Sequence, residues 1–259
     1  MNILFLGDVV AKSGRQAVYD RLPTLKREYA ADFVIVNAEN AAHGKGITKS
    51  IYTRLKEAGA DIITLGNHAF SKKVILADLD VCEDMIRPFN MEPRDKGQYY
   101  AVRTCRKKKI AVINLLGSVF MNAADEDPVP CMDRILKEVE ADILILDMHA
   151  EATSEKEMMF YRYRNRLTAV IGTHTHVQTA DERIANGCAY ITDAGMCGPY
   201  ESILGRDVDE VMEIMVKHHK TNFTPAEGPA IISGVLIRVD ESTCRAVSIE
   251  RILERPDID

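Results

Sequence analysis

Val170-Ile171-Gly172-Thr173-His174-Thr175-His176-Val177 joins an apolar run to two histidines. The run of residues 168–171 predicts a buried strand that stops at Gly172. Because alternate side chains of an extended segment point the same way, His174 and His176 are predicted to face one point just past that strand. Imidazole is the commonest protein metal ligand near neutral pH. The pair alone is a weak signal, since a lone histidine on an apolar face is more often a core residue.

The composition is that of a globular protein. The 259 residues are 46% hydrophobic and 28% charged, which suffices for a sizeable core, and we predict a single domain over residues 1–259. The formal net charge of -6 argues against a general binder of nucleic acid or membrane surfaces. No run approaches the ~20 apolar residues of a membrane helix, and Met1–Leu6 does not read as a signal peptide. Six scattered cysteines without a Cys-x-x-Cys pair predict reduced thiols and a cytoplasmic protein.

Apolar runs alternate with amphipathic segments along most of the chain. The predicted strands are residues 2–6, 33–36, 61–65, 99–103, 109–115, 142–146, 168–171, 188–192, 234–239 and 246–252. The predicted helices are residues 13–29, 48–58, 72–87, 132–140, 154–166 and 207–217, with N-caps at Ser13 and Ser154. Residues 119–131 read as a surface loop. This alternation predicts the α/β class, with a mainly β last part.

Side chains of the ligand type follow five of the predicted strands. They are Asp8, Glu39 and Asn40, Asn67 and His68, His149, and His174 with His176. In α/β sheets, ligands bind outside the carboxyl ends of the strands. Oxygen and imidazole donors without thiolate suit manganese, iron or zinc. Six or seven such ligands are too many for one tetrahedral ion, so the set predicts two ions about 3.5–4 Å apart with a bridging carboxylate.

Four members of this set also have a simpler interpretation. Asp8 could cap the following helix, and Asn40 and Asn67 could be turn residues. His149 could be a core histidine with its hydrogen bonds satisfied. The arrangement would be accidental only if such interpretations held at every strand end at once. For that reason we favour the metal site.

For three neighbouring features the sequence does not decide between a structural role and a role in binding. Glu151 reads more readily as an acid at a helix start than as a ligand. Contact of His43 and of the loop Gly44-Lys45-Gly46 with substrate stays open, because a short glycine-rich loop can cradle a phosphate or merely turn the chain. The substrate-binding residues are not predicted.

The order of these motifs resembles a known superfamily. Gly7-Asp8, Gly66-Asn67-His68, His149 and Gly172-Thr-His174-Thr-His176 resemble the calcineurin-like metallophosphoesterases. Asn2-Ile-Leu-Phe-Leu-Gly-Asp-Val-Val, Val36-Asn-Ala-Glu-Asn-Ala and Ile191-Thr-Asp-Ala-Gly-Met resemble one branch, the bacterial YmdB-type phosphodiesterases. The resemblance runs from residue 2 to about residue 255.

The departures from the family pattern are few. The superfamily has a histidine where this chain has Val10 and a bridging aspartate where it has Glu39, and the branch shares both differences. Ala11 and Phe70-Ser71 stand where the branch has Gly and Trp-Asp. These differences concern pocket shape and substrate preference rather than the ligands.

The resemblance implies two packed mixed β-sheets flanked by helices, with a dinuclear metal site at the carboxyl ends of the strands. It implies that one ion is held by Asp8, Glu39, Asn40 and His176, and the other by Glu39, Asn67, His149 and His174. The implied cofactors are two metal ions, iron or manganese first and zinc as the alternative. His68 is implied to lie beside the ions without binding them.

The resulting prediction is a metal-dependent phosphodiesterase for small phosphodiesters, with 2',3'-cyclic nucleotides implied by the resemblance. Two cations would neutralise the phosphate and supply a bridging hydroxide, and His68 would protonate the leaving alkoxide. The alternatives are a phosphomonoesterase or nucleotidase on the same site, or a metal-bound regulatory protein with little catalysis. We expect a small nucleotide substrate, no membrane and no stable nucleic-acid partner, and the sequence leaves homo-oligomerisation open.

Overall fold

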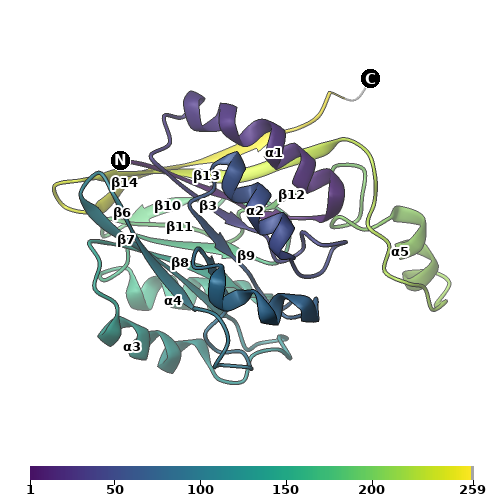
Figure 1. Ribbon diagram of the computed structural model, residues 1–259, viewed down its shortest axis with the longest axis horizontal. Helices are drawn as coiled ribbons and strands as arrows, with labels where there is room; N and C mark the ends of the chain where they lie inside the picture. The colour runs from purple at the N-terminus through teal and green to yellow at the C-terminus, as the bar shows by residue number, and fades with distance from the viewer. Residues whose placement is uncertain (258–259) are drawn as a thin grey trace.

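Two mixed β-sheets pack face to face, and helices cover their outer faces (Figure 1). The computed structural model describes residues 1–257, so residues 258–259 of the predicted domain lie outside the described residues. The first sheet contains β1 (Asn2–Leu6), β2 (Asp8–Val9), β3 (Phe33–Asn37), β4 (Ile62–Thr64), β5 (Met85–Ile86), β12 (Met196–Pro199), β13 (Ala230–Asp240) and β14 (Arg245–Glu254). The second contains β6 (Tyr100–Cys105), β7 (Lys108–Leu116), β8 (Ile143–His149), β9 (Ala169–Thr173), β10 (Arg183–Ala185) and β11 (Cys188–Ile191). The predicted α/β class and pair of mixed sheets are confirmed.

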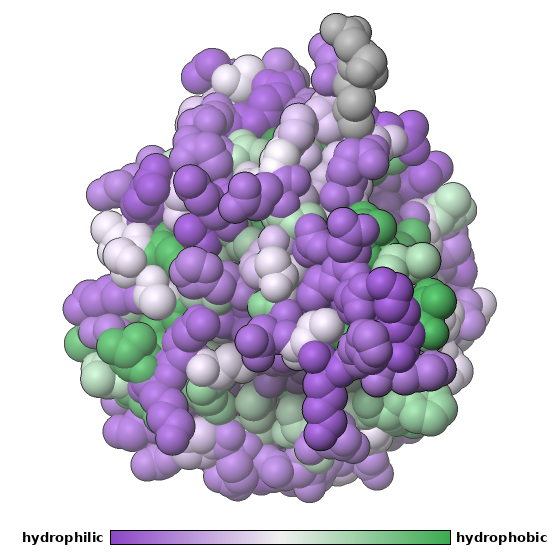
Figure 2. Space-filling view, turned by 90° about the vertical axis from the view of Figure 1, so that its right-hand side faces the viewer, coloured by the Kyte–Doolittle hydropathy of each residue, from purple (hydrophilic) through white to green (hydrophobic). Residues whose placement is uncertain are grey.

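The helices lie on opposite sides of this sandwich. α1 (Ala11–Glu28) and α2 (Lys49–Ala58) cover the first sheet, whereas α3 (Pro128–Glu138) and α4 (Thr153–Tyr163) cover the second (Figure 1). α5 (Val208–Met215) projects from one end (Figure 1). The face on that side is mainly hydrophilic, with small separate hydrophobic areas (Figure 2). No helix among residues 1–257 is long and apolar enough to cross a membrane.

Strand alternation divides the apolar residues into layers. In β1, Ile3 and Phe5 belong to the core between the sheets, while Leu4 and Leu6 belong to the core beneath α1 and α2. Successive side chains of a strand point to opposite faces, so a strand with both faces covered reads as a continuous apolar run. β1, β3, β4 and β5 pair in parallel, as do β7, β8, β9 and β11. Parallel strands end at the same edge, and this edge carries the site.

The helix predicted over residues 72–87 is wrong. The segment forms two short 3-10 helices, Lys73–Ala77 and Leu79–Val81, and then strand β5. Ile75 and Leu79 are buried at the spacing of a helix face, which explains the misleading pattern. Met85 and Ile86 instead pair with β4 and extend the sheet by one strand. A tertiary pairing has overridden the local periodicity.

Three helix starts were also misplaced. α1 begins at Ala11 and α4 at Thr153, and neither Ser13 nor Ser154 occupies the N-cap position. α3 begins at Pro128, inside the predicted surface loop. Proline suits the first turn of a helix because the amide hydrogen that it lacks would have no helical partner there.

Candidate metal centre

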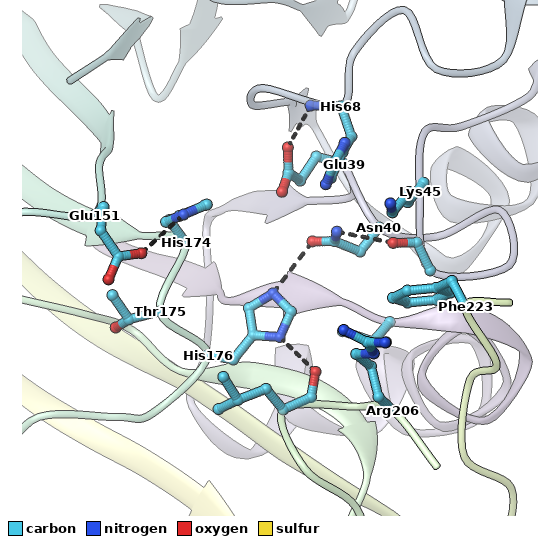
Figure 3. A pocket seen from close by; sticks show the side chains of 13 residues that line it. Glu39, Asn40, Lys45, His68, Glu151, His174, Thr175, His176, Arg206 and Phe223 are labelled. Atoms are coloured by element: carbon cyan, nitrogen blue, oxygen red, sulfur yellow. Dashed lines mark hydrogen bonds and ion pairs between the residues drawn. The ribbon is translucent and has the colours of Figure 1, made fainter. Parts of the chain in front are cut away.

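The predicted ligands come together at the carboxyl edge of both sheets, and four of them line a cavity of about 370 Å³: Glu39, Asn40, His174 and His176 (Figure 3). Asp8 lies in β2, directly after β1, and His149 is the last residue of β8. The remaining predicted ligands, Glu39, Asn40, Asn67, His174 and His176, lie in the loops that follow β3, β4 and β9.

The tightest group surrounds one ring nitrogen of His149. Its Nε2 lies 3.0 Å from Asn67 Oδ1, 3.2 Å from Glu39 Oε1 and 3.1 Å from His174 Nδ1. Donor atoms of Glu39, His149 and His174 lie within 4.8 Å of one another. These four residues come from both sheets, and they are the set predicted for one of the two ions.

The residues predicted for the other ion form a looser group. His176 Nε2 lies 3.3 Å from Asn40 Oδ1. One oxygen of Asp8 accepts a hydrogen bond from the His174 amide at 3.1 Å. The other, Oδ1, is buried and has no hydrogen-bond partner among the described residues. Glu39 lies near both groups: its Oε1 faces His149 at 3.2 Å, and its negative charge acts on the carboxylate of Asp8.

His149 and His176 each use Nδ1 in a hydrogen bond that points away from the site, and this decides which ring nitrogen faces it. His149 Nδ1 donates to the Thr173 hydroxyl at 2.8 Å, which in turn donates to buried Asp147 at 2.7 Å. His176 Nδ1 donates to the Leu204 carbonyl at 3.0 Å. In His149 and His176 alike, these bonds use Nδ1 and direct Nε2 into the site, the arrangement typical of metal-binding histidines.

Glu151 plays the same part for His174, and the sequence analysis missed this. The residue precedes α4, as predicted, but its carboxylate lies 3.1 Å from His174 Nε2. His174 Nδ1 is thereby left as the free acceptor facing His149. Only the fold brings Glu151 to His174.

The two histidines of the His-x-His motif are not in an extended segment. His174 has φ of 102° and His176 has φ of 66°, so the predicted strand-like alternation is wrong even though both rings reach the site. Asp193 holds the loop: its Oδ2 accepts from the Thr175 amide at 3.0 Å and from the Thr175 hydroxyl at 2.8 Å. Fully buried Lys156 lies 3.0 Å from the same oxygen. A buried ion pair therefore fixes the turn that carries both rings.

Burial and mutual charge shift the pKa values of the cluster. Burial raises the pKa of Asp8 to about 6. Burial opposes ionisation of Glu39 and His149 as well, but their attraction and hydrogen bond outweigh it, lowering the pKa of Glu39 to about 2 and raising that of His149 to about 9. Burial and the charge of His149 lower the pKa of His174 to about 3. Perturbed groups gathered in a cleft are typical of functional sites.

The glycine of the Gly-Asn-His motif makes room for the cluster. A Cβ atom at Gly66 would overlap both the carboxylate of Glu39 and the ring of His149. The absence of a side chain therefore lets residues from the two sheets approach one another.

These residues fit a pair of cations. Asp8 has a buried oxygen with no hydrogen-bond partner among the described residues, and His149 and His176 direct Nε2 into the site, so a cation would find donor atoms there. Carboxylate, amide oxygen and imidazole are also the donors that manganese, iron and zinc accept. Glu39 lies near both groups and offers two oxygens, one 3.2 Å from His149 Nε2 and the other at the His68 amide.

Other polar side chains complete the cavity. The ring of His68 lines it, with Nδ1 3.4 Å from the Ser71 hydroxyl, and burial lowers the pKa of His68. Lys45, Arg206 and Phe223 form the wall on the side away from Glu151 (Figure 3). His43 does not line this cavity but a neighbouring one, against residues 224–228. Arg206 and Phe223 come from the connection between β12 and β13, and no sequence motif marks them.

Comparison with known proteins shows similarity over nearly the whole chain. A family model described as YmdB-like protein matches residues 4–252. A Bacillus subtilis protein named 2',3'-cyclic-nucleotide 2'-phosphodiesterase is 46% identical, over 99% of this chain and 98% of that protein. Among solved structures, a novel phosphatase from Mycoplasma pneumoniae has a TM-score of 0.93 and 38% identity, covering 98% of this chain and 93% of the other. A hypothetical protein from Thermus thermophilus has a TM-score of 0.92 and 37% identity, covering 98% and 99%.

Proposed function

The chain belongs to the YmdB-like protein family, and from this membership we propose that it is a metal-dependent phosphodiesterase that hydrolyses 2',3'-cyclic nucleotides. The Bacillus relative named for this activity is 46% identical along the whole chain. The structural support is the convergence of Glu39, Asn67 and His174 on His149 Nε2. Four potential ligand atoms this close together suit a cation bound among them.

The proposed ligand sets are Asp8, Glu39, Asn40 and His176 for one ion, and Glu39, Asn67, His149 and His174 for the other. Bound together, such cations neutralise the charge of a phosphodiester and supply a hydroxide at neutral pH. Glu39, the residue common to both sets, would hold both ions. Iron or manganese is the proposed metal, with zinc as the alternative, since the set contains no thiolate.

His68 is the proposed general acid. Its backbone amide donates to Glu39 at 2.9 Å, which ties residue 68 to the cluster, and its side chain lines the cavity. Burial lowers the pKa of His68, and a protonated imidazole with a lowered pKa gives up its proton more readily to a leaving alkoxide. Ser71 Oγ lies 3.4 Å from the Nδ1 of His68 and helps to orient the ring, which leaves Nε2 to face the substrate.

Two further proposals concern the domain organisation and the cellular location of the protein. We propose that residues 1–259 act as one domain, because strands of both sheets contribute to one apolar layer. We also propose a cytoplasmic site of action. All six cysteines are free in the structure, as expected in a reducing compartment.

The test uses two leaving groups of different basicity. For the metal-loaded His68→Ala variant, kcat on 2',3'-cyclic AMP should fall by about 10²–10⁴-fold, because its ribose alkoxide needs a proton. The loss on bis(4-nitrophenyl) phosphate should be much smaller, since nitrophenolate leaves without one. His219→Ala, at an exposed histidine next to Glu213, is the matched control.

The outcome separates the proposal from its alternatives. Equal losses on both substrates would remove His68 from the role of acid. A wild-type enzyme that hydrolyses nucleoside monophosphates but not 2',3'-cyclic AMP would be a nucleotidase. A protein that hydrolyses neither when loaded with manganese or iron would be a regulatory protein with a metal site.

A further inference from the structure

Two cationic side chains stand on one wall of the cavity, and the proposed hydrolysis does not use them. Lys45 and Arg206 lie on the side away from Glu151 and His174, and the ring of Phe223 stands between them (Figure 3). Lys45 Nζ lies 5.1 Å from the centre of that ring, and the guanidinium carbon of Arg206 lies 5.0 Å from it. Both distances are those of cation–π contacts, so one aromatic ring holds two cations at the cavity.

Arg206 is anchored from behind. Its Nε and Nη2 donate to the two carboxylate oxygens of Glu210, at 3.1 and 2.6 Å. The Thr221 hydroxyl donates to the same carboxylate at 2.6 Å. Such a bidentate pair fixes the plane of the guanidinium group, and the connection between β12 and β13 thus brings Arg206 and Phe223 to the cavity as one unit.

Lys45 is placed by the glycine-rich loop. A Cβ atom at Gly44 would overlap the ring of Phe223, so only glycine lets the loop lie against it. The carbonyl of Gly44 accepts a hydrogen bond from Asn40 Nδ2 at 3.0 Å, which ties the loop to a proposed metal ligand. Lys45 makes no ion pair with a described carboxylate, and its charge is available to a ligand.

We propose that Lys45 and Arg206 form a second anion subsite, which binds a phosphate other than the one that is hydrolysed. This inference rests on the proposed function, in which the reacting phosphate lies beside Glu39 and His149. A cavity of about 370 Å³ is of the size that holds one small ligand such as a nucleotide. A 2',3'-cyclic nucleotide has only its 5' position left to carry another phosphate.

The substrate class is therefore a 2',3'-cyclic nucleotide that carries a phosphoryl group at its 5' position. This group has two sources. It is the free phosphate of a mononucleotide, or the linking phosphate at the 3' end of a short RNA that terminates in a cyclic phosphate. Lysine and a fixed guanidinium group bind both forms through charge-assisted hydrogen bonds.

The experiment compares kcat/KM of the metal-loaded enzyme on three substrates. They are 2',3'-cyclic AMP, the same nucleotide with a 5'-phosphate, and a dinucleotide that ends in a 2',3'-cyclic phosphate. We expect wild type to prefer at least one 5'-phosphorylated substrate by about tenfold or more, the usual worth of a hydrogen bond to a charged group. Which of the two is preferred identifies the source of the phosphate.

Variants of Lys45 and Arg206 test whether these two residues cause the preference for a 5'-phosphorylated substrate. Lys45→Gln should bring the ratio between the phosphorylated and unphosphorylated substrates close to one, and Arg206→Lys should lower it as well. Lys107→Gln, on the exposed turn between β6 and β7, removes the same charge elsewhere and should keep the ratio of the wild type.

Two results would overturn the subsite. One is a wild-type ratio near one. The other is a proportional loss on all three substrates in Lys45→Gln, which would put Lys45 at the reacting phosphate. If wild type hydrolyses none of them, the proposed function fails, and calorimetric binding of adenosine 5'-phosphate then decides the subsite: Lys45→Gln must weaken it by about tenfold.

Discussion

The buried pair between Lys156 and Asp193 allows a stability prediction with a definite size. The two charged atoms lie 3.0 Å apart and both side chains are 0% exposed. Lys156→Met keeps most of the packing of the side chain but leaves the Asp193 carboxylate buried with only neutral donors, from Thr175 and Gly195. Removing one partner of such a pair costs about 3–5 kcal/mol of unfolding free energy. For a chain of this size the melting temperature should fall by about 10 °C.

The assay is urea unfolding of the metal-free protein, followed by circular dichroism at pH 7. Lys107→Met on the exposed hairpin turn is the control and should change the free energy by about 0.5 kcal/mol or less. The double variant Lys156→Met/Asp193→Asn, which removes both charges, should regain part of the loss. A loss under about 1 kcal/mol in Lys156→Met would refute this reasoning, because the carboxylate would then not depend on its partner.

Two further predictions concern metal uptake. Because Glu39 raises the pKa of His149 to about 9, the metal-free protein holds a proton on that ring at pH 7. The stabilisation of the folded metal-free protein by the Glu39–His149 pair is complete below about pH 6.5 and is lost as pH rises through about 9. Calorimetry with Mn²⁺ in buffers of different ionisation enthalpy should show about one proton released at pH 7 and about half a proton at pH 9. No release at pH 7 would contradict the assignment. Gly66→Ala should fold but bind Mn²⁺ at least about tenfold more weakly, because its methyl group enters the space between Glu39 and His149; unchanged affinity in equilibrium dialysis would show that these two residues do not share an ion.

Local sequence patterns predicted the main elements of the fold. Continuous apolar runs such as Phe33–Val36 read as buried strands because both faces of their sheets are covered. The ligand-type residues could be chosen because they follow strands, and parallel strands end at one edge. Asp8, Glu39 and His149 accordingly lie close together, as the sequence analysis expected.

The same patterns failed where distant contacts decide the conformation. Met85 and Ile86 form a strand only because β4 offers a free edge beside them. His174 and His176 adopt positive φ angles because Asp193 holds the turn between them. Periodicity reports which side chains are apolar, and it carries no information on which partner a backbone will find.

The sequence by itself determined the chemical character of the site, since oxygen and imidazole donors at successive strand ends are visible in the chain. Only the tertiary structure decided which nitrogen of each ring is free, through contacts such as Glu151 with His174, and which cations face the cavity. Lys45 and Phe223 have 177 residues between them along the chain, yet they lie in contact. The physical reason is that hydrogen bonds and ion pairs act across a few ångströms of space, whatever the length of chain between the partners.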